Sequence, residues 1–258
     1  MKVVIFAGGK GSRISEESIL RPKPMIEIGG KPILWHIMKH YASYGHNEFV
    51  ICLGYKGEVI KEYFLNYFAH HSDMTIDLKD NQVKVSDSSC EEFKISLIDT
   101  GLETMTAGRL KQVKKYLDNE AFMLTYGDGV SDVNIDKLIE FHKSKKGLVT
   151  MTGVQPQSRF GMLDIDDNDM VRTFQEKPKN ENVWINGGFF VIEPDIFDYL
   201  HDDADDTMWE RQPLEDICAK NQLAVYKHYG FWKCMDTMRD KIELNDLWEN
   251  DPKWKNWK

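Results

Sequence analysis

The first half of the chain alternates short apolar runs with longer stretches whose apolar residues share one helical face. Residues 3–6 form the first run and lead into Gly8, a pattern typical of a buried parallel strand that enters a turn. Apolar residues then recur at i, i+3, i+4 and i+7 between Pro32 and Gly45, a spacing that predicts a helix. These apolar positions are Leu34, Ile37, Met38 and Tyr41.

Strand and helix patterns continue to alternate as far as residue 142. The predicted strands cover residues 49–53, 95–98 and 122–126, and the predicted helices cover residues 59–68, 110–117 and 135–142. Strands separated by helices in this way favour a doubly wound α/β fold. In such a fold a mostly parallel, Rossmann-like mixed sheet carries helices on both faces.

The pattern changes after residue 147. Two apolar runs, residues 162–165 and 170–174, flank four polar residues and predict a hairpin. A strand is predicted over residues 184–192 and a closing helix over residues 237–248. We therefore expect one domain over residues 1–240, whose part from residue 148 is small and β-rich, followed by a C-terminal helix and tail over residues 241–258.

Composition and charge narrow the class of protein. The 258 residues are 41% hydrophobic, which is enough to bury a core without disulfide bonds. A net charge of -9 argues against nucleic-acid binding, because such proteins neutralise phosphates with surface Lys and Arg. No stretch approaches the ~18 apolar residues of a membrane span, and the N-terminus has no signal-peptide pattern, so we expect a cytoplasmic protein.

Several remaining features have plain structural interpretations. The four cysteines form no C-x-x-C pair and have no His at metal-ligand spacing, so we interpret them as reduced thiols. The acidic run over residues 202–206 is typical of a solvated loop. Trp254 and Trp257 in the tail either fold back onto the core or meet another subunit, because exposed tryptophans are costly.

The segment GGKGSR, residues 8–13, follows the first predicted strand and is a candidate phosphate-binding loop. Its glycines allow backbone N–H groups to approach phosphate oxygens. The segment alone fits a tight turn or a dinucleotide loop equally well. Lys10, Arg13 and the polar chain that follows them disfavour a dinucleotide loop. A Walker loop fails because the G-x-x-x-x-G-K-[ST] spacing is missing and no helix is predicted at the end of the segment.

Three charged residues are candidates for phosphate chemistry beside this loop. Prolines on both sides restrict the backbone of Lys23, although an ordinary surface lysine is the alternative. Asp128 follows a predicted strand at the edge where open α/β sheets bind ligands, although it could instead cap a helix. Asp236 could share a Mg²⁺ ion with Asp128, or serve as the N-cap of the closing helix.

Two later motifs suit a sugar phosphate. Glu176 and Lys177 follow the predicted hairpin, where a carboxylate accepts hydrogen bonds from hydroxyls and an ammonium meets a phosphate dianion. Such a pair is more often a solvated surface pair when it stands alone. Asn186 and Gly187 belong to an Asn-Gly-Gly segment that interrupts the strand predicted over residues 184–192.

These motifs together resemble a known family. GGKGSR followed by RPKPM, GDG, EKP, INGGFF and a late Asp resembles the sugar-1-phosphate nucleotidyltransferases over nearly the full chain. The longer stretches RPKPMIEIGGKPILWHIMKHY, LTYGDG and GFWKCMDTMRDK resemble the members of that family that use CTP. The resemblance implies that CTP and α-D-glucose 1-phosphate give CDP-glucose and pyrophosphate, the first step toward the 3,6-dideoxyhexoses of bacterial O-antigen.

The resemblance also implies roles for individual residues. It implies Mg²⁺ on Asp128 and Asp236, a nucleotide-binding half over residues 1–147 and a sugar-binding half over residues 148–240. Its nucleotide-binding positions are Ala7, Gly8, Gly9, Lys10, Gly11, Ser12, Arg13, Lys23, Thr106, Gly108, Arg109 and Asp128. Its sugar-binding positions are Gly161, Glu176, Lys177, Asn186 and Gly187. Members of the family also tend to be homo-oligomers, often hexamers.

This sequence departs from the family pattern at three positions. Ser12 replaces the commoner Thr, Ala107 a commoner Gly, and Cys234 a commoner Pro. Ser12 keeps the hydroxyl, whereas the other two changes could alter loop geometry near the base and the metal. We expect them to affect kinetics more than function.

The chemistry implied by the resemblance needs no general base, because a sugar phosphate oxygen is already anionic at neutral pH. Repulsion between two polyanions opposes the reaction, so the site must supply cations and alignment. We expect Arg13 to bind the leaving pyrophosphate, Lys23 the α-phosphate and Lys177 the sugar phosphate, with Asp128 completing the catalytic set. The alternatives to a CTP-using enzyme are a uridylyl- or thymidylyltransferase and a non-catalytic relative that binds nucleotide.

Overall fold

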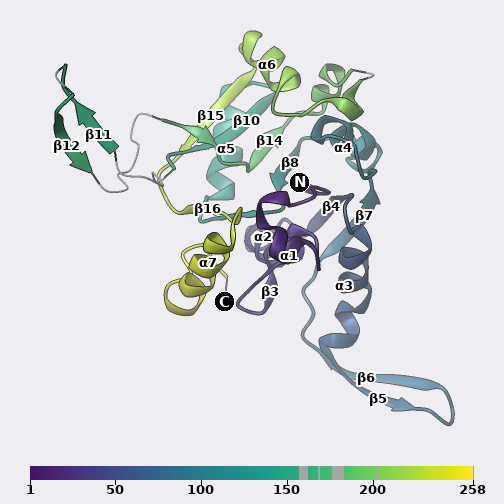
Figure 1. Cartoon of the computed structure of the whole chain (residues 1–258). Helices are drawn as coiled ribbons and strands as arrows, with labels where there is room; N and C mark the ends of the chain where they lie inside the picture. Colours follow the sequence, from purple (N-terminus) through teal and green to yellow (C-terminus); the bar gives the residue numbers. More distant parts are fainter. Residues whose placement is uncertain (157–161, 168, 176–182, 202, 258) are drawn as a thin grey trace.

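The centre of the molecule is an eight-stranded sheet. The computed structural model describes residues 1–156, 162–167, 169–175, 183–201 and 203–257. The sheet has the strand order β13-β10-β14-β8-β1-β4-β7, with β15 beside β10 (Figure 1). Its strands are β1 (Val3–Ala7), β4 (Glu48–Leu53), β7 (Lys94–Asp99), β8 (Phe122–Tyr126), β10 (Val149–Val154), β13 (Ile185–Asn186), β14 (Phe190–Ile192) and β15 (Leu223–His228).

The pairing of these strands confirms the predicted mostly parallel sheet. β1 pairs in parallel with β4 and β8, β4 with β7, and β10 with β15, whereas β14 is antiparallel to both β8 and β10. The single strand predicted over residues 184–192 is wrong. Its backbone breaks at Gly187 and Gly188, where Gly188 has φ of +76°, so two short strands, β13 and β14, pair with β10 instead.

Helices cover both faces of the sheet, as predicted. One face carries α2 (Ile33–Ala42), α3 (Gly57–His70) and α5 (Ile135–Lys145), and the other carries α4 (Thr106–Val113) and α6 (Gln212–Ala219). α7 (Met238–Asn250) closes the chain against the first of these faces. Within the described residues, no helix has both the length and the apolar character that crossing a bilayer requires.

The helix predicted over residues 110–117 begins four residues earlier than expected, at Thr106, and its last part is a short 3-10 turn. The backbone N–H of Ala107 donates to the carbonyl of Thr207 at 3.1 Å, and that of Met105 donates to the carbonyl of Asp205 at 2.7 Å. A segment about 100 residues away therefore satisfies the amides at the start of this helix. No local apolar pattern could indicate that start.

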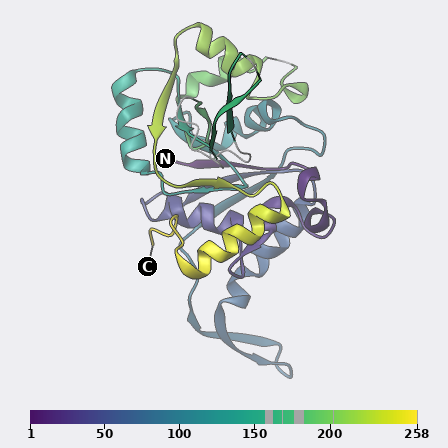
Figure 2. The ribbon, with the colours of Figure 1, turned by 60° about the vertical axis from the view of Figure 1, so that its left-hand side comes forward.

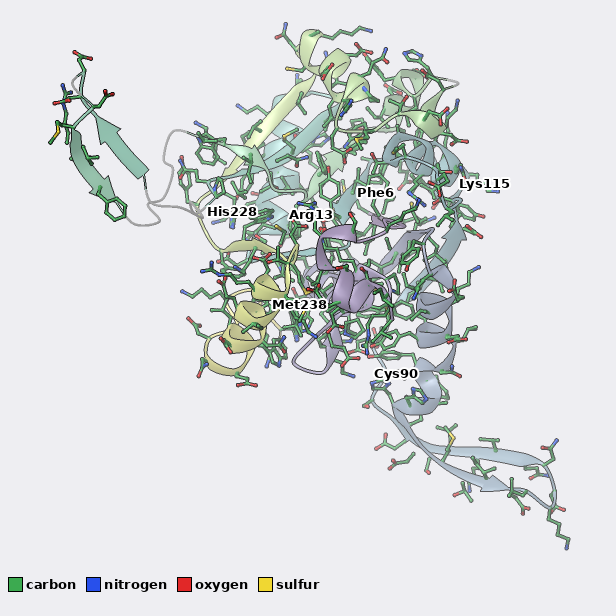
Figure 3. The ribbon with its side chains drawn as sticks, in the orientation of Figure 1. Phe6, Arg13, Cys90, Lys115, His228 and Met238 are labelled. Atoms are coloured by element: carbon green, nitrogen blue, oxygen red, sulfur yellow. The ribbon has the colours of Figure 1, made fainter. Side chains whose placement is uncertain are left out.

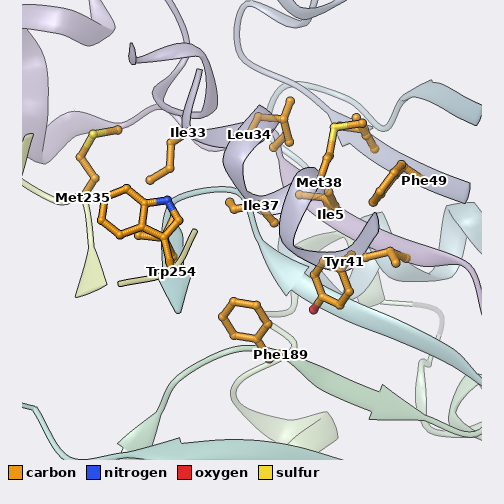
Figure 4. Packing of buried hydrophobic residues seen from close by; sticks show 14 of the residues in the cluster. Ile5, Ile33, Leu34, Ile37, Met38, Tyr41, Phe49, Phe189, Met235 and Trp254 are labelled. Carbon is orange, nitrogen blue, oxygen red and sulfur yellow. The ribbon is translucent and has the colours of Figure 1, made fainter. Parts of the chain in front are cut away.

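The alternation of side chains along β1 explains the two cores. Val3 and Ile5 face the core shared with α2 and α7, whereas Val4 and Phe6 face the core shared with α4 and α6. Figure 4 shows the first core, in which the side chains of α2 pack over Ile5 and Phe49. Both faces of β1 are thus apolar, as expected for a central parallel strand.

The C-terminal tail folds back onto its own chain, one of the two alternatives for its tryptophans. Trp254 is completely buried, and its ring stacks on Phe231 with 5.6 Å between centroids. Its indole Nε1 donates to Nδ1 of His36 at 3.4 Å. Trp257 meets Trp35 edge to face at 5.8 Å. The tail therefore seals the outer end of the first core.

Two hairpins project from the body (Figure 1), and the one that follows α3 is also seen to project in Figure 2. The hairpin of β11 (Met162–Ile165) and β12 (Val171–Gln175) confirms its prediction. The hairpin of β5 (Ser72–Asp77) and β6 (Gln82–Ser88) had no predicted counterpart, because its strands mix charged and apolar residues and join no larger sheet. An isolated two-stranded hairpin is at best marginally stable in water.

Two neutral histidines in α2 predict a loss of stability at acid pH. Burial lowers the pKa of both His36 and His40 to about 4, from an ordinary value of 6.5. The unfolded chain therefore binds protons that the folded chain excludes, so stability is fully present above pH 6.5 and is lost as the pH falls toward 4. The loss should reach about 3 kcal/mol for each histidine at the acid end.

Urea unfolding at a series of pH values between 7.5 and 4.5 measures this loss. The free energy of unfolding should fall less steeply between pH 6.5 and 5 in His36→Gln than in the wild type. The control His70→Gln, which changes an exposed imidazole, should show the wild-type fall. A free energy of unfolding that stays flat over this interval in the wild type would contradict the assignment.

Candidate active site

The strand order identifies the crevice in which a ligand is expected. β4 and β7 continue on one side of β1, and β8 lies on the other side, so the order reverses between β1 and β8. Open α/β sheets bind ligands at the carboxyl ends of the strands at such a reversal. Residues 8–13 leave the end of β1, and Asp128 follows the end of β8. The topology thus brings two of the predicted motifs to one edge.

The loop of residues 8–13 is ordered by local hydrogen bonds. Gly11 has φ of +63°, which favours glycine, and its carbonyl accepts from the backbone N–H of Ile14 and from Oγ of Ser18. The prediction that no helix begins at the end of the loop is wrong. A 3-10 turn, η1 (Ser12–Ile14), begins there and leads into a short α-helix, α1 (Ser15–Ser18). These bonds, rather than an apolar stripe, produce the turns.

The two cations of the loop lie in different surroundings. Nζ of Lys10 pairs with the exposed carboxylate of Glu103 at 2.8 Å. Nη1 of Arg13 pairs with Oδ2 of Asp236 at 2.7 Å, although the Arg13 side chain is 74% exposed. Figure 3 shows Arg13 where the N-terminal segment faces the chain that leads into α7. Arg13 is therefore both anchored at the site and accessible to a ligand.

Lys23 forms the centre of the site. Its Nζ lies 2.5 Å from Oδ2 of Asp128 and 2.6 Å from Oδ1 of Asp236, and the residue is 9% exposed. Burial alone would lower the pKa of this ammonium, but the charges and hydrogen bonds of the two carboxylates outweigh it and raise the pKa. Lys23 is thus a buried, permanently charged cation, and the alternative of an ordinary surface lysine is wrong.

Strand pairing brings the two aspartates together. β9 (Gly129–Ser131) pairs antiparallel with β16 (Trp232–Cys234), with Gly129 opposite Cys234. The backbone N–H of Met235 then donates to the carbonyl of Asp128 at 2.8 Å. This pairing across about 100 residues places both carboxylates around one Nζ.

Neither aspartate acts as a helix cap. Asp128 precedes a strand, and the N-cap of α7 is Thr237, whose hydroxyl accepts from the backbone N–H of Asp240. Asp240 returns the interaction and completes a capping box. The capping alternatives for Asp128 and Asp236 are therefore wrong, and both carboxylates are available for chemistry.

The donor set at this point fits a divalent cation. Asp128 and Asp236 supply hard oxygen ligands, and they already converge on one positive charge, the Lys23 ammonium. Mg²⁺ is usually held by one or two carboxylates together with substrate phosphates. Across the described part of the chain, no three His, Cys, Asp or Glu residues group as a preformed metal site. A metal held by these two carboxylates would draw its remaining ligands from water and substrate phosphates.

Cys234, one of the three departures from the family pattern, lies beside these carboxylates. Its Sγ is 3.7 Å from Oδ2 of Asp236. Burial and the neighbouring negative charges raise the pKa of the thiol to about 11, so it is uncharged at neutral pH. The substitution therefore adds no charge to the site.

Arg109 supports the loop from the protein interior. Its guanidinium donates to the carbonyl of Leu53 at 2.8 Å, to Oγ1 of Thr100 at 2.6 Å, and more weakly to the carbonyls of Gly8 and Leu102. A Cβ on Gly8 would lie 2.2 Å from this guanidinium, so a side chain there would displace Arg109 from its hydrogen bonds. Arg109 thus ties together the chain ends that follow β1, β4 and β7.

The two predicted nucleotide-binding positions next to Arg109, Thr106 and Gly108, lie at the start of α4. A Cβ on Gly108 would lie 2.6 Å from Cα of Asp205, so the backbones pack too closely for any side chain. Oγ1 of Thr106 donates to Oε2 of Glu210 at 2.8 Å. The residues between η4 (Pro194–Tyr199) and α6 therefore hold the start of α4 in place.

Two of the predicted sugar-binding residues contact the end of β8 and β16. Nδ2 of Asn186 donates to the Tyr126 hydroxyl at 3.1 Å, and Oδ1 of Asn186 accepts from the backbone N–H of Gly188. The carbonyl of Gly187 accepts from Nε1 of Trp232 at 2.7 Å. The remaining predictions for the sugar, Gly161, Glu176 and Lys177, fall outside the described residues.

Sequence reasoning missed three residues of this region: Tyr126, Glu210 and Trp232. Tyr126 directly precedes the Gly-Asp-Gly motif and could have been noticed for that reason. Glu210 and Trp232 have no local signal, because only tertiary contacts bring them to the site.

Comparison with known proteins agrees with this geometry. The family model of nucleotidyl transferases matches residues 2–254. The chain therefore belongs to the nucleotidyl transferase family, and it is an enzyme of that class. Enzymes of this family generally use a divalent metal, in line with the paired carboxylates Asp128 and Asp236.

Full-length relatives place the chain within one branch of the family. It is 52% identical to glucose-1-phosphate cytidylyltransferase of Salmonella typhi and 48% identical to a probable glucose-1-phosphate cytidylyltransferase of Bacillus subtilis, each over the whole of both chains. The chain thus falls among the glucose-1-phosphate cytidylyltransferases.

A solved structure confirms the fold. The crystal structure of a putative glucose-1-phosphate thymidylyltransferase from Bacillus anthracis matches with a TM-score of 0.72, at 16% identity, over all of this chain and 97% of that one. At this identity the match supports the architecture alone.

Proposed function

We propose that this enzyme transfers CMP from CTP to α-D-glucose 1-phosphate, giving CDP-glucose and pyrophosphate. One observation carries the reaction type: Arg13 and Lys23 gather with Asp128 and Asp236 beside a glycine-rich loop at the order reversal of the sheet. The choice of CTP and glucose 1-phosphate is supported by the relatives that are 52% identical over the full length. The product would supply CDP-linked 3,6-dideoxyhexoses of O-antigen.

The residues of the site suit an attack that needs no general base. An oxygen of the sugar phosphate forms a bond to the α-phosphorus of CTP, and the bond from that phosphorus to the pyrophosphate oxygen breaks. We assign Lys23 to the α-phosphate and Arg13 to the departing pyrophosphate, because these two cations lie at the carboxylate pair. Asp128 and Asp236 would hold Mg²⁺, which supplies further positive charge to the reacting phosphates.

The loop and the sugar side complete the proposed substrate site. The backbone N–H groups of residues 8–13 would bind phosphate oxygens, and the start of α4, with Thr106 and Gly108, would face the cytosine. Asn186 and Gly187 would bind glucose, together with Gly161, Glu176 and the phosphate-binding Lys177. In this assignment, residues 1–147 form the nucleotide-binding half and residues 148–240 the sugar-binding half.

The proposal also includes a cytoplasmic location, where CTP is available. It further includes a homo-oligomer, which is a hexamer by the family resemblance. The β5–β6 hairpin supports the oligomer. Strand register puts Met74 opposite Val85 and Ile76 opposite Val83, so these four side chains share one face of the hairpin. Ile76 is 57% and Val83 63% exposed, and a second copy of the chain would cover this apolar face.

A panel of nucleotides tests the proposed reaction. Pyrophosphate release and sugar-nucleotide formation are measured with glucose 1-phosphate and each of CTP, UTP, dTTP and ATP. We expect kcat/KM for CTP to exceed the others by roughly 100-fold, because a site that hydrogen-bonds one base leaves polar groups unpaired with another. A control without sugar phosphate reports background hydrolysis.

The other outcomes are equally informative. A preference for UTP or dTTP would replace the proposal with a uridylyl- or thymidylyltransferase. If the protein binds nucleotide but releases pyrophosphate from none of the four, the result would favour a non-catalytic relative.

A further inference from the structure

A carboxylate outside the phosphate site links the two halves of the proposed substrate site. Glu210 lies between η5 (Ala204–Asp206) and α6, and it is half-buried. Its Oε2 accepts from Oγ1 of Thr106 at 2.8 Å, and its Oε1 accepts from the hydroxyl of Tyr126 at 2.7 Å. One side chain therefore joins the start of α4 to the end of β8.

The direction of each of these hydrogen bonds is determined by its neighbours. Oγ1 of Thr106 accepts from the backbone N–H of Trp209 at 2.8 Å, and the Tyr126 hydroxyl accepts from Nδ2 of Asn186 at 3.1 Å. Each hydroxyl has a single proton, which it donates to Glu210. An ionised carboxylate suits this place because it accepts both protons and donates none.

The same chain of hydrogen bonds orients Asn186. Its Oδ1 accepts from the backbone N–H of Gly188 at 2.9 Å, and one proton of Nδ2 goes to Tyr126. The amide cannot flip without breaking both contacts. The second Nδ2 proton is then presented in a fixed direction, as recognition of a sugar hydroxyl requires.

We propose that Glu210 is a positioning residue that aligns both substrates, holding Asn186 for the sugar through Tyr126 and the start of α4 for the nucleoside through Thr106. The inference rests on the proposed function, since it takes the two sides as sugar and nucleoside. Glu210 need not touch either substrate.

Three variants separate the contact of Glu210 with Tyr126, on the sugar side, from its contact with Thr106, on the nucleoside side. Glu210→Gln keeps the shape but introduces a donor, so we expect KM for both CTP and glucose 1-phosphate to rise about tenfold, with a smaller change in kcat. Tyr126→Phe should raise KM for glucose 1-phosphate and leave that for CTP within about twofold. Thr106→Val should raise KM for CTP and leave that for glucose 1-phosphate within about twofold. Glu215→Gln, which changes an exposed carboxylate on α6, is the matched control.

A double variant tests whether the residues act as one unit. Adding Tyr126→Phe to Glu210→Gln should cause little further increase in KM for glucose 1-phosphate, because the first change already breaks that contact. Melting temperatures of all variants are measured in parallel, and we expect them to stay close to that of the wild type.

The outcomes distinguish this inference from the proposed function. If the wild-type enzyme does not use CTP and glucose 1-phosphate, the proposed function fails, and the variants are compared on the substrates that it does use. If the wild type uses them and Glu210→Gln has wild-type KM values, the inference is overturned. It is equally overturned if the Tyr126 and Thr106 variants show no substrate split and only lose stability.

Discussion

Replacing Asp128 by Asn should reduce turnover by about a thousandfold or more at every Mg²⁺ concentration. The change keeps the size of the side chain but removes the charge that faces Lys23 at 2.5 Å. It also removes one of two carboxylates that converge on a single cation. A neutral amide is a far weaker ligand for a hard divalent cation, and a lost electrostatic partner in a buried site commonly costs two to three orders of magnitude in rate. Formation of CDP-glucose, followed over a Mg²⁺ titration, gives the measurement.

Asp136→Asn provides the control for this experiment. Asp136 lies in the first turn of α5 and is exposed, so its substitution alters net charge equally without touching the site. Wild-type turnover is expected for it. Near-normal turnover of the Asp128 variant at saturating Mg²⁺ would remove Asp128 from the catalytic set.

The elements that could be predicted from the sequence are those whose signal is local. β1 and β4 are continuous apolar runs, and α2 begins after Pro32 and ends before Gly45, so their bounds need no knowledge of the rest of the fold. The place of Asp128 at the carboxyl edge of the sheet is predictable for the same reason, because it comes two residues after such a strand.

The start of α4 and the role of Arg109 could not be predicted in this way. The amides at the start of α4 are satisfied by carbonyls near residue 206, and Arg109 binds carbonyls at the ends of separate strands. Their partners are chosen by the tertiary fold. The family resemblance predicts that Arg109 lies in the segment that binds the nucleotide, but it does not reveal that Arg109 is buried beneath the loop.

Glu210 illustrates the same limit for the candidate site. Its neighbours in sequence form no recognised motif, and both of its partners lie at least 84 residues away. Each separate motif indicates one part of the candidate site. The contacts of Glu210 that join these parts become visible only in three dimensions.

Replacing Lys23 by Met should lower the rate and strengthen the response to metal. In the described structure the Lys23 ammonium is held between Asp128 and Asp236, so a metal must compete with it for the same oxygens. Without the ammonium, the two carboxylates repel each other, and the metal-free protein should lose about 3 kcal/mol or more of stability. The α-phosphate also loses its cation, and we expect turnover to fall by roughly 100- to 1,000-fold.

Thermal unfolding in the presence and absence of MgCl₂ tests the two consequences together. Mg²⁺ should raise the melting temperature of the Lys23 variant by more than that of the wild type, because a tighter site gains more from the same free metal. Lys10→Met, which removes an exposed cation paired with Glu103, should respond to Mg²⁺ as the wild type does. If the Lys23 variant instead shows the wild-type metal response, Asp128 and Asp236 do not form the metal site, even where its turnover is low. A loss of turnover with an enlarged metal response would identify Lys23 as the cation that fills the carboxylate pair before metal and substrate arrive.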